Sequence, residues 1–214
     1  PDPYRVWVSE IMLQQTQVER VKDYFHRFVT KFPSVFDLAE ADEAVVLKYW
    51  EGLGYYRRAR QLHAAAKLIV SDHEGIFPHD ACALRQLPGV GRYTAGAIAS
   101  ISFDLPEPIL EANSRRVLAR LTHYGRPLSG NKDDQPLWDI AAAIVPRDGG
   151  AGAFNQALMD LGSIVCTPVS PSCETCPLAE HCEAYQRGSV DQIPNVPTRK
   201  SSKKINEKAY VLVH

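Results

Sequence analysis

Residues 87–97, Leu-Pro-Gly-Val-Gly-Arg-Tyr-Thr-Ala-Gly-Ala, constrain the fold of this chain more than any other stretch. Gly89 and Gly91 stand two apart, after a proline and before small residues that favour a helix. Glycine adopts positive φ and leaves room for a ligand beside the backbone, and the start of the following helix favours a phosphate. With the apolar stretch 81–84, the pattern predicts two helices joined by a glycine hairpin that grips a DNA strand by its backbone. A plain tight turn between packed helices is the alternative.

The bulk composition is that of an ordinary globular protein. The 214 residues, 45% hydrophobic and 23% charged, fit one domain or two small ones. A net charge of −1 argues against coating nucleic acid by charge alone, but it allows a local basic face. No apolar run is long enough to span a bilayer and no signal peptide opens the chain. We therefore expect an intracellular protein with no membrane partner, and we interpret the start at Pro1 as that of a fragment.

Three groups of basic residues could form a local basic face. Each could equally be a solvated helix face or a linker, which is the default interpretation for any one group alone. They are Arg57, Arg58 and Arg60; Arg115, Arg116 and Arg120; and Arg199, Lys200, Lys203 and Lys204.

Apolar residues recur at helical spacing through most of the chain, which predicts an all-α fold. Asp2 and Pro3 are suited to start the first helix. The other predicted helices lie at 18–29, from Asp42 to 50, at 59–70, after the hairpin, and around 113–121, 135–145 and 154–165. The proline-containing connector 104–108 is the best boundary between two halves, and the cleft between them is the expected site. Alternation typical of a strand occurs only at 209–213.

Four of the five cysteines crowd into one late stretch. Cys166, Cys173, Cys176 and Cys182 have the spacing C-x6-C-x2-C-x5-C. Four thiolates this close favour a soft metal centre. Zinc is the alternative, but four-cysteine zinc sites usually have two C-x2-C pairs, and the wider gaps here suit a [4Fe–4S] cluster. Cys82 lies apart, and we expect it to be a small buried residue.

No flavin or nicotinamide glycine fingerprint accompanies the cysteines, which argues against a redox enzyme. The cluster is better suited to fix the loop 167–177, so that polar and basic neighbours of the loop meet DNA.

The assembled motifs resemble those of the helix-hairpin-helix DNA glycosylases that carry an iron–sulfur loop. Within that superfamily the chain resembles the adenine DNA glycosylase family, from Pro3 to about Arg187. Three stretches carry this closer resemblance: 8–17 (Val-Ser-Glu-Ile-Met-Leu-Gln-Gln-Thr-Gln), 52–60 (Gly-Leu-Gly-Tyr-Tyr-Arg-Arg-Ala-Arg) and 154–157 (Phe-Asn-Gln-Ala). Long matches of polar and glycine residues are hard to obtain from packing alone.

The resemblance implies a two-lobed helical fold with a defined division of the chain. Residues 5–105 would form a six-helix module with the hairpin, and residues 1–4 with 106–188 the iron–sulfur module. Residues 189–205 would be a linker, and 206–214 the first strand of a truncated MutT-like domain. That domain helps relatives to recognise 8-oxoguanine, so we expect impaired lesion discrimination without it.

The family removes adenine mispaired with 8-oxoguanine or guanine by hydrolysing the N-glycosidic bond of a flipped nucleotide. The expected partner is therefore double-stranded DNA with such a mispair, bound by a monomer. The expected location is the cytoplasm or nucleoid of a bacterium, or the nucleus or mitochondrion of a eukaryote.

Two carboxyl groups carry the expected chemistry. Glu10 matches the general acid that protonates N7 of the adenine, and a desolvated carboxyl with a raised pKa suits that role. A solvent-facing helix glutamate is the alternative without the motif. Glu111 stands where the family has an aspartate that stabilises the positively charged sugar. Its carboxylate reaches one methylene further, and a misplacement of about 1 Å can cost on the order of a hundredfold in rate.

Three interpretations of Glu111 follow. We favour retained but weakened catalysis with a shifted backbone. A natural variant with altered activity and an engineered change that traps substrate are the other two.

Tyr93 replaces the lysine that forms a Schiff base in the bifunctional relatives, so the resemblance implies a monofunctional glycosylase. Tyr93 and Asn113 would support the sugar and the second carboxylate by hydrogen bonds. The resemblance implies contacts with DNA or with the target base for Gln15, Thr16, Leu53, Tyr55, Gly89, Gly91 and Gln156. Side chains inserted into the duplex stabilise its kinked form.

Two other functions remain open. A thymine or uracil mismatch glycosylase is one, because related enzymes also have tyrosine in the hairpin; the stretches 14–17 and 52–56 argue against it. A DNA-binding module without activity, disabled at Glu111, is the other.

Overall fold

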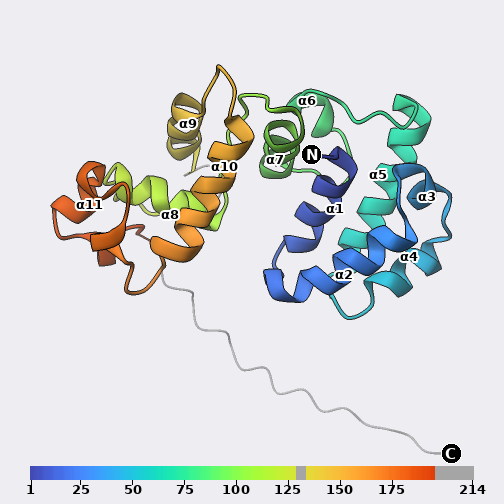
Figure 1. Ribbon diagram of the computed structural model, residues 1–214, viewed down its shortest axis with the longest axis horizontal. Helices are drawn as coiled ribbons and strands as arrows, with labels where there is room; N and C mark the ends of the chain where they lie inside the picture. The colour runs from blue at the N-terminus through green and yellow to red at the C-terminus, as the bar shows by residue number, and fades with distance from the viewer. Residues whose placement is uncertain (129–133, 196–214) are drawn as a thin grey trace, which may run out of the picture.

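The computed structural model describes residues 1–128 and 134–195, and within these ranges it contains helices and no strand (Figure 1). The expected strand at 206–214 and most of the expected linker lie outside the described residues. No helix in the described part of the chain is both long enough and apolar enough to cross a membrane.

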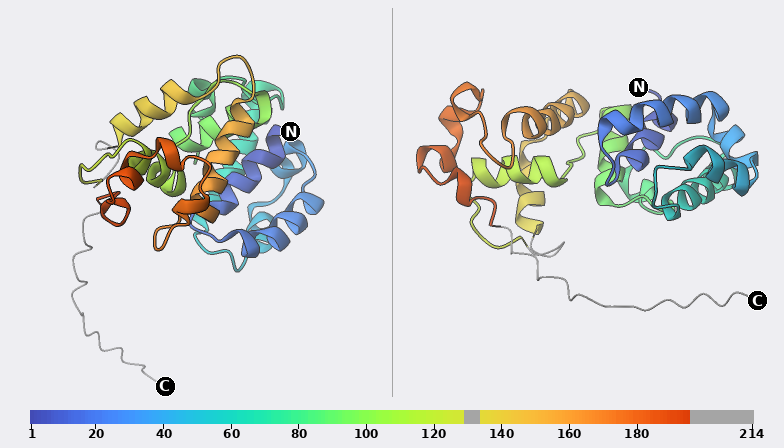
Figure 2. Two further views of the ribbon diagram at one scale, coloured as in Figure 1. Left: turned by 60° about the vertical axis from the view of Figure 1, so that its left-hand side comes forward. Right: turned by 90° about the horizontal axis from the view of Figure 1, so that it is seen from below.

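The helices form two lobes, each with its own apolar core (Figures 1 and 2). The first lobe contains α1 (Pro3–Leu13), α2 (Val18–Lys31), α3 (Val35–Glu40), α4 (Glu43–Trp50), α5 (Arg57–His73), α6 (Ala81–Leu84) and α7 (Arg92–Phe103). The second contains α8 (Ala112–Leu121), α9 (Gln135–Ile144), α10 (Ala151–Asp160), a π-helix (Leu161–Val165) and α11 (Glu183–Gln186). Short 3-10 helices at Cys173–Thr175, Ala179–His181 and Val190–Gln192 complete it. An all-α, two-lobed fold is confirmed.

Local sequence explains where several helices begin. The Asp2 side chain accepts a hydrogen bond from the Tyr4 backbone N–H, and Pro3 occupies the first turn of α1. Ser34 and Asp37 cap α3 reciprocally, although α3 is absent from the sequence-based prediction. The signal for α3 was a Ser-x-x-Asp spacing ahead of a helix too short to show a period.

The structure differs from the expected division at both ends of the chain. Of residues 1–4, Tyr4 does not join the second lobe: its side chain packs in the core of the first lobe, and its hydroxyl donates to the Phe32 carbonyl. The start of the expected linker packs on the second lobe, where Ile193 is buried. Cys82 is exposed rather than buried, because α6 spans a single turn and turns Leu84 toward the core instead.

The lobes meet where α10 packs against α7. Close approach depends on glycine, because a Cβ on Gly152 would lie 2.5 Å from the Ser100 carbonyl oxygen. The Asp104 carboxylate, in the connector, accepts hydrogen bonds from the backbone N–H groups of Gly150 (2.8 Å) and Gly152 (3.0 Å) at the start of α10. The connector thus fixes α10, and with it one wall of the candidate site.

Candidate active site

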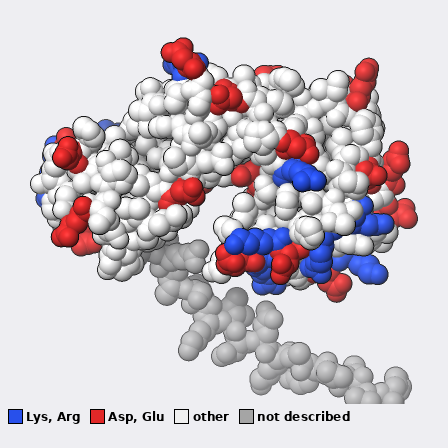
Figure 3. Space-filling view, in the orientation of Figure 1, with Lys and Arg blue, Asp and Glu red and all other residues white. Residues whose placement is uncertain are grey.

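A pocket of about 360 Å³ lies between α1 and α10, where the two lobes meet. Figure 3 shows the surface hollowed between the lobes on one face of the molecule. Glu10 from α1 and Gln156 from α10 both line the pocket, so the structure brings these two expected site residues together. The other lining residues are Pro1, Val6, Ser9, Ile101, Met159 and Asp160.

Glu10 is a buried carboxyl at the inner end of this pocket, 7% exposed. Burial raises its pKa above the ordinary value for a glutamate, and the charge of Glu111 raises it further. The Tyr93 hydroxyl of α7 donates a 2.8 Å hydrogen bond to Glu10 Oε2, which acts in the opposite direction. Glu10 therefore holds its proton to a higher pH than an exposed glutamate does.

Tyr93 contacts Glu10 rather than Glu111. Its hydroxyl also lies 3.3 Å from the Met159 sulfur, so the ring spans from α7 to α10 behind the pocket. Burial and the charges of Glu10 and Glu111 raise the pKa of Tyr93 well above its ordinary value, which keeps the hydroxyl a proton donor.

Glu111 is the N-cap of α8. Its two carboxylate oxygens accept hydrogen bonds from the backbone N–H groups of Asn113 and Ser114, each 2.7 Å long, and the Ser114 hydroxyl accepts from the Glu111 N–H. The helix start stabilises the negative charge. The longer side chain is accommodated by folding back on the helix, which holds the carboxylate in one position.

Asn113 supports Glu111 through its backbone N–H, while its side chain serves another purpose. The Asn113 Oδ1 accepts a 2.8 Å hydrogen bond from Arg116, whose guanidinium also donates to the carbonyls of Gly162 and Cys166. The Asn113 side chain therefore links α8 to the segment that leads into the cysteines.

The glycine hairpin joins α6 to α7. Gly89 has a φ of +79°, as expected from the sequence, but Gly91 is extended at −87° and is the N-cap of α7. Of the two glycines, Gly89 uses the positive φ that glycine allows, and Gly91 does not. A Cβ on Gly91 would meet no atom within 4 Å, so a small residue at this position is not required by packing within the chain.

Two exposed turns lie beside each other at the end of α1 and before α5. Gln15 and Tyr55 adopt left-handed backbone conformations, with φ of +58° and +48°, and both side chains are exposed. Thr16 lies in the first turn and is half-buried. Leu53 differs from these residues, because its side chain is 6% exposed and packs in the first lobe's core.

The four late cysteines line one pocket of the second lobe. None of them forms a disulfide. Burial and the neighbouring cysteines raise the pKa of the Cys173 thiol, and the charge of Arg120 acts in the opposite direction. Four cysteine thiols around one pocket are the donor set of an iron–sulfur cluster.

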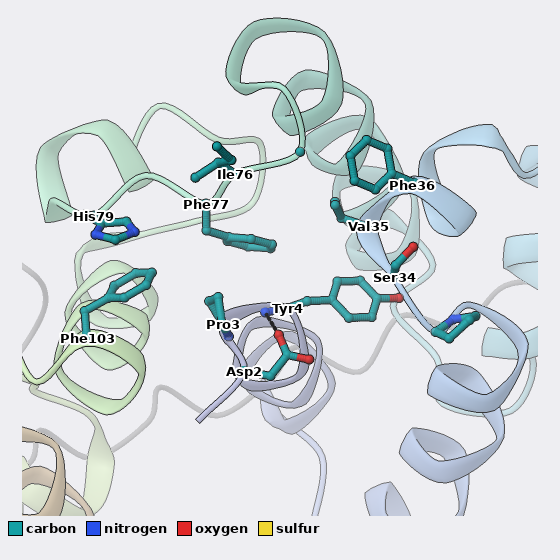
Figure 4. A pocket seen from close by; sticks show the side chains of 12 residues that line it. Asp2, Pro3, Tyr4, Ser34, Val35, Phe36, Ile76, Phe77, His79 and Phe103 are labelled. Atoms are coloured by element: carbon teal, nitrogen blue, oxygen red, sulfur yellow. Dashed lines mark hydrogen bonds between the residues drawn. The ribbon is translucent and has the colours of Figure 1, made fainter.

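A second, mostly apolar pocket lies beside the first residues of α1 (Figure 4). It is about 340 Å³ in volume, and His79 stacks on Phe103 at one side of it with ring centroids 4.2 Å apart. Among its lining residues Asp2 is the single carboxylate, and Asp2 caps α1. This pocket therefore has no counterpart of the buried Glu10 that lines the first.

Comparison with known proteins identifies the family. Residues 8–135 match the HhH-GPD superfamily of base excision DNA repair proteins. The chain belongs to this superfamily. Residues 166–182 match the iron–sulfur binding domain of endonuclease III, so this HhH-GPD protein carries a [4Fe–4S] cluster, with Cys166, Cys173, Cys176 and Cys182 placed to hold it.

Curated relatives of this HhH-GPD chain include adenine DNA glycosylases. The protein from Mus musculus is 46% identical over 92% of the chain, and that from Buchnera aphidicola (Schizaphis graminum) is 40% identical over 96%. The chain spans 38% and 58% of their respective lengths.

Solved structures share the fold. A thermostable thymine-DNA glycosylase matches with a TM-score of 0.77 and 31% identity, covering 87% of this chain and 85% of that one. An endonuclease III–DNA complex matches with a TM-score of 0.73 at 22% identity, covering 88% and 86%.

Sequence reasoning missed three buried arginines of this HhH-GPD chain. Arg58, Arg116 and Arg120 are each 8% exposed or less, although they stand in the groups considered as basic faces. Arg120 donates to the carbonyls of Thr167 and Ile193 and lies 3.3 Å from the Cys166 sulfur. Residues 161–186 contain no lysine or arginine, so the cysteine loop has no basic neighbour within its own sequence. Their burial could have been predicted from their helical spacing, because Arg116 and Arg120 lie on the same face of α8 as the buried Val117.

Proposed function

We propose that this chain removes adenine from DNA in which it is mispaired with 8-oxoguanine or guanine. The single observation that carries the proposal is the buried Glu10 in this pocket, whose pKa is raised by burial and by the charge of a second carboxylate, Glu111. Two carboxyl groups held in different environments are the general solution for cleaving a glycosidic bond. The adenine DNA glycosylases among the relatives, at 40% and 46% identity, support adenine as the base.

The reaction begins when the adenine nucleotide leaves the duplex and its base enters the pocket. Glu10 donates its proton to N7 of the base, while Tyr93 orients the carboxyl through its hydrogen bond. Gln156 contacts the base from the opposite wall. The bond between the base nitrogen N9 and C1′ of the sugar then breaks with both electrons passing to the base.

Glu111 acts on the sugar that remains. Its fixed negative charge stabilises the positive charge that develops on C1′ and the ring oxygen. Water adds to C1′ and loses a proton to a carboxylate, which leaves an abasic sugar and neutral adenine. Because α8 holds the carboxylate by two backbone N–H groups, the charge is in place before substrate arrives.

The chain would be monofunctional. A lyase needs an amine to form a Schiff base with C1′, whereas the residue of α7 that faces Glu10 is Tyr93. The product is therefore an abasic site with an intact strand.

DNA binding in this proposal uses the hairpin and the two exposed turns. Gly89 and Gly91 let a phosphate approach the start of α7, and Gln15, Thr16 and Tyr55 enter the duplex beside the mispair. We leave Leu53 out, because its side chain is buried. Basic side chains on the face of Figure 3 gather over α2, mixed with acidic ones, so a local surface rather than net charge binds DNA. We propose that the chain acts as an intracellular monomer.

A thymine mismatch glycosylase is the second candidate, favoured by the TM-score of 0.77 with a thymine-DNA glycosylase. A carboxyl acid facing the base suits adenine, whose N7 accepts a proton.

The test compares duplexes with one A:8-oxoguanine, A:G or T:G pair under single-turnover conditions. We expect strand breaks at adenine only after hot alkali, and no adduct with borohydride. Release at T:G alone would overturn the adenine assignment, and breaks without alkali would overturn the monofunctional one.

Variants of the two acids complete the test. Glu10→Gln should abolish release, because an amide cannot donate the proton. Glu111→Asp should act at least as fast as the parent chain, since the family places aspartate there. Inactivity of both the parent chain and Glu111→Asp would favour a DNA-binding module instead.

A further inference from the structure

Arg58 of α5 connects the two exposed turns that carry Gln15 and Tyr55. Its guanidinium donates to the carbonyls of Ile11 (2.9 Å), Met12 (3.0 Å) and Gln14 at the end of α1. The last carbonyls of a helix lack partners within it and carry partial negative charge, so they suit a buried cation. Arg58 thus closes the end of α1 and fixes the point where the Gln15 turn begins.

The same guanidinium holds both turns. Arg58 Nη2 donates to the Thr16 hydroxyl (3.2 Å) and to the Gly54 carbonyl (3.4 Å). The guanidinium also lies 5.4 Å from the ring centroids of Tyr55 and Trp50. One side chain therefore touches the residue after Gln15, the residue before Tyr55, and the Tyr55 ring itself.

The two turns depend on such support. Gln15 and Tyr55 both have positive φ, a conformation that non-glycine residues hold only where the surroundings impose it. Neither side chain is buried, and Tyr55 is 63% exposed, so core packing does not fix them. No carboxylate pairs with Arg58 among the described residues, so its role is not that of an ordinary ion pair.

We propose that Arg58 is a positioning residue that sets Gln15 and Tyr55 in one register, so that both enter the duplex together and hold the target base out of the stack. This rests on the proposed function. Arg58 does not touch DNA or the base; it acts through the two turns. A planar fork with several donors is required, and lysine cannot supply it.

The test uses the whole chain and a duplex with fluorescent 2-aminopurine in place of the target adenine, opposite 8-oxoguanine. The fluorescence rise reports unstacking and does not need cleavage. In Arg58→Lys we expect a rise about tenfold smaller and a single-turnover rate on the adenine duplex about tenfold lower. Affinity for a fully matched duplex should stay within about twofold, because phosphate contacts dominate it.

Two control variants separate positioning from lost stability. Arg5→Lys makes the same substitution at an exposed guanidinium of α1 that pairs with Asp2 (3.7 Å), and should leave unstacking unchanged. Val46→Ala, in the core of the same lobe, lowers the melting temperature without touching either turn. Both are assayed well below their melting temperatures.

If Arg58→Lys unstacks the base to the same extent as Val46→Ala does, the proposal is overturned and the proposed function stays intact. A parent chain that unstacks the base but releases no adenine would overturn the proposed function alone. A parent chain that unstacks no base would overturn both.

Discussion

The burial of the Glu10 carboxyl makes the stability of the folded chain depend on pH. Its carboxyl is buried among α1 and α7 side chains, and burial raises its pKa. The unfolded chain releases this proton at the ordinary pKa of a glutamate, whereas the folded chain retains it to a higher pH. The stability that this difference contributes is fully present below the ordinary pKa. It is lost as the pH rises through the raised pKa of the folded state.

Glu10→Gln should therefore be inactive yet more stable near neutral pH. The amide cannot ionise, so the variant escapes a penalty of about 1.4 kcal/mol for each unit by which the pKa is raised. Urea unfolding at several pH values would measure the gain. It should grow as the pH rises above the ordinary pKa and vanish below it. Equal pH dependence of parent and variant would contradict the assigned shift.

Tyr93→Phe tests whether the Tyr93 hydroxyl controls the pKa of Glu10. In the parent chain the hydrogen bond from the Tyr93 hydroxyl lowers the pKa of Glu10. The variant lacks this bond, so the pKa of Glu10 should rise further. The rate should then decline at a higher pH on the alkaline side of the pH–rate profile, while falling overall because the carboxyl is less well oriented. An unchanged alkaline limb would show that Tyr93 does not act on Glu10.

At the scale of elements, sequence was informative where a single residue type decides the backbone. Asp2 with Pro3 predicted the start of α1, and the positive φ of Gly89 followed from the hairpin motif. The sequence did not predict whether a long charged side chain is exposed to water or is buried against backbone carbonyls from distant segments. Arg58 and Arg120 look like surface charges in the sequence, and only the fold supplies the carbonyls that bury them.

The candidate site likewise contains some features that the sequence predicted and others that only the fold reveals. The motif around Glu10 predicted a buried acid. No pattern indicated that both carboxylate oxygens of Glu111 would accept hydrogen bonds from backbone N–H groups at the start of α8. That arrangement depends on the helix beginning at Ala112, a boundary that sequence fixes only to within a few residues. Leu53 shares a motif with Tyr55, yet the loop buries the Leu53 side chain and exposes that of Tyr55.

The hairpin offers a matched pair of substitutions. Gly89→Ala should destabilise the chain by about 1 kcal/mol or more, because its φ is +79° and the new Cβ would lie 3.0 Å from Gln61 Cβ. Gly91→Ala should leave the melting temperature unchanged, because the position is extended and open. It should weaken DNA binding, since a methyl group would stand where a phosphate approaches. Full DNA affinity in Gly91→Ala would remove Gly91 from the interface.

At the scale of the molecule, the two lobes differ in how they are held together. Among the described residues, the buried apolar cluster of the first lobe has 26 members and that of the second has 11. Small cores usually need a staple such as a metal centre. Arg116 and Arg120 attach residues 161–193 to α8, and the cluster would join the four cysteines within that segment to one another.

Loss of the cluster should therefore loosen one lobe and spare the other. Cys176→Ser should lower the iron content and the absorbance of the cluster. It should speed amide hydrogen exchange across 161–193 while α1 to α7 stay protected. Cys82→Ser, at the exposed cysteine of the first lobe, is the matched control and should change neither. Loosening of both lobes to the same degree would contradict separate cores.

The pocket that holds Glu10 takes one wall from each lobe, and Asp104 joins those lobes through the first residues of α10. The width of the pocket therefore depends on how the two lobes are set relative to each other as well as on the side chains that line it. In the proposed function, a change at Asp104, Gly150 or Gly152 would shift α10 and alter base selectivity without replacing any residue that lines the pocket.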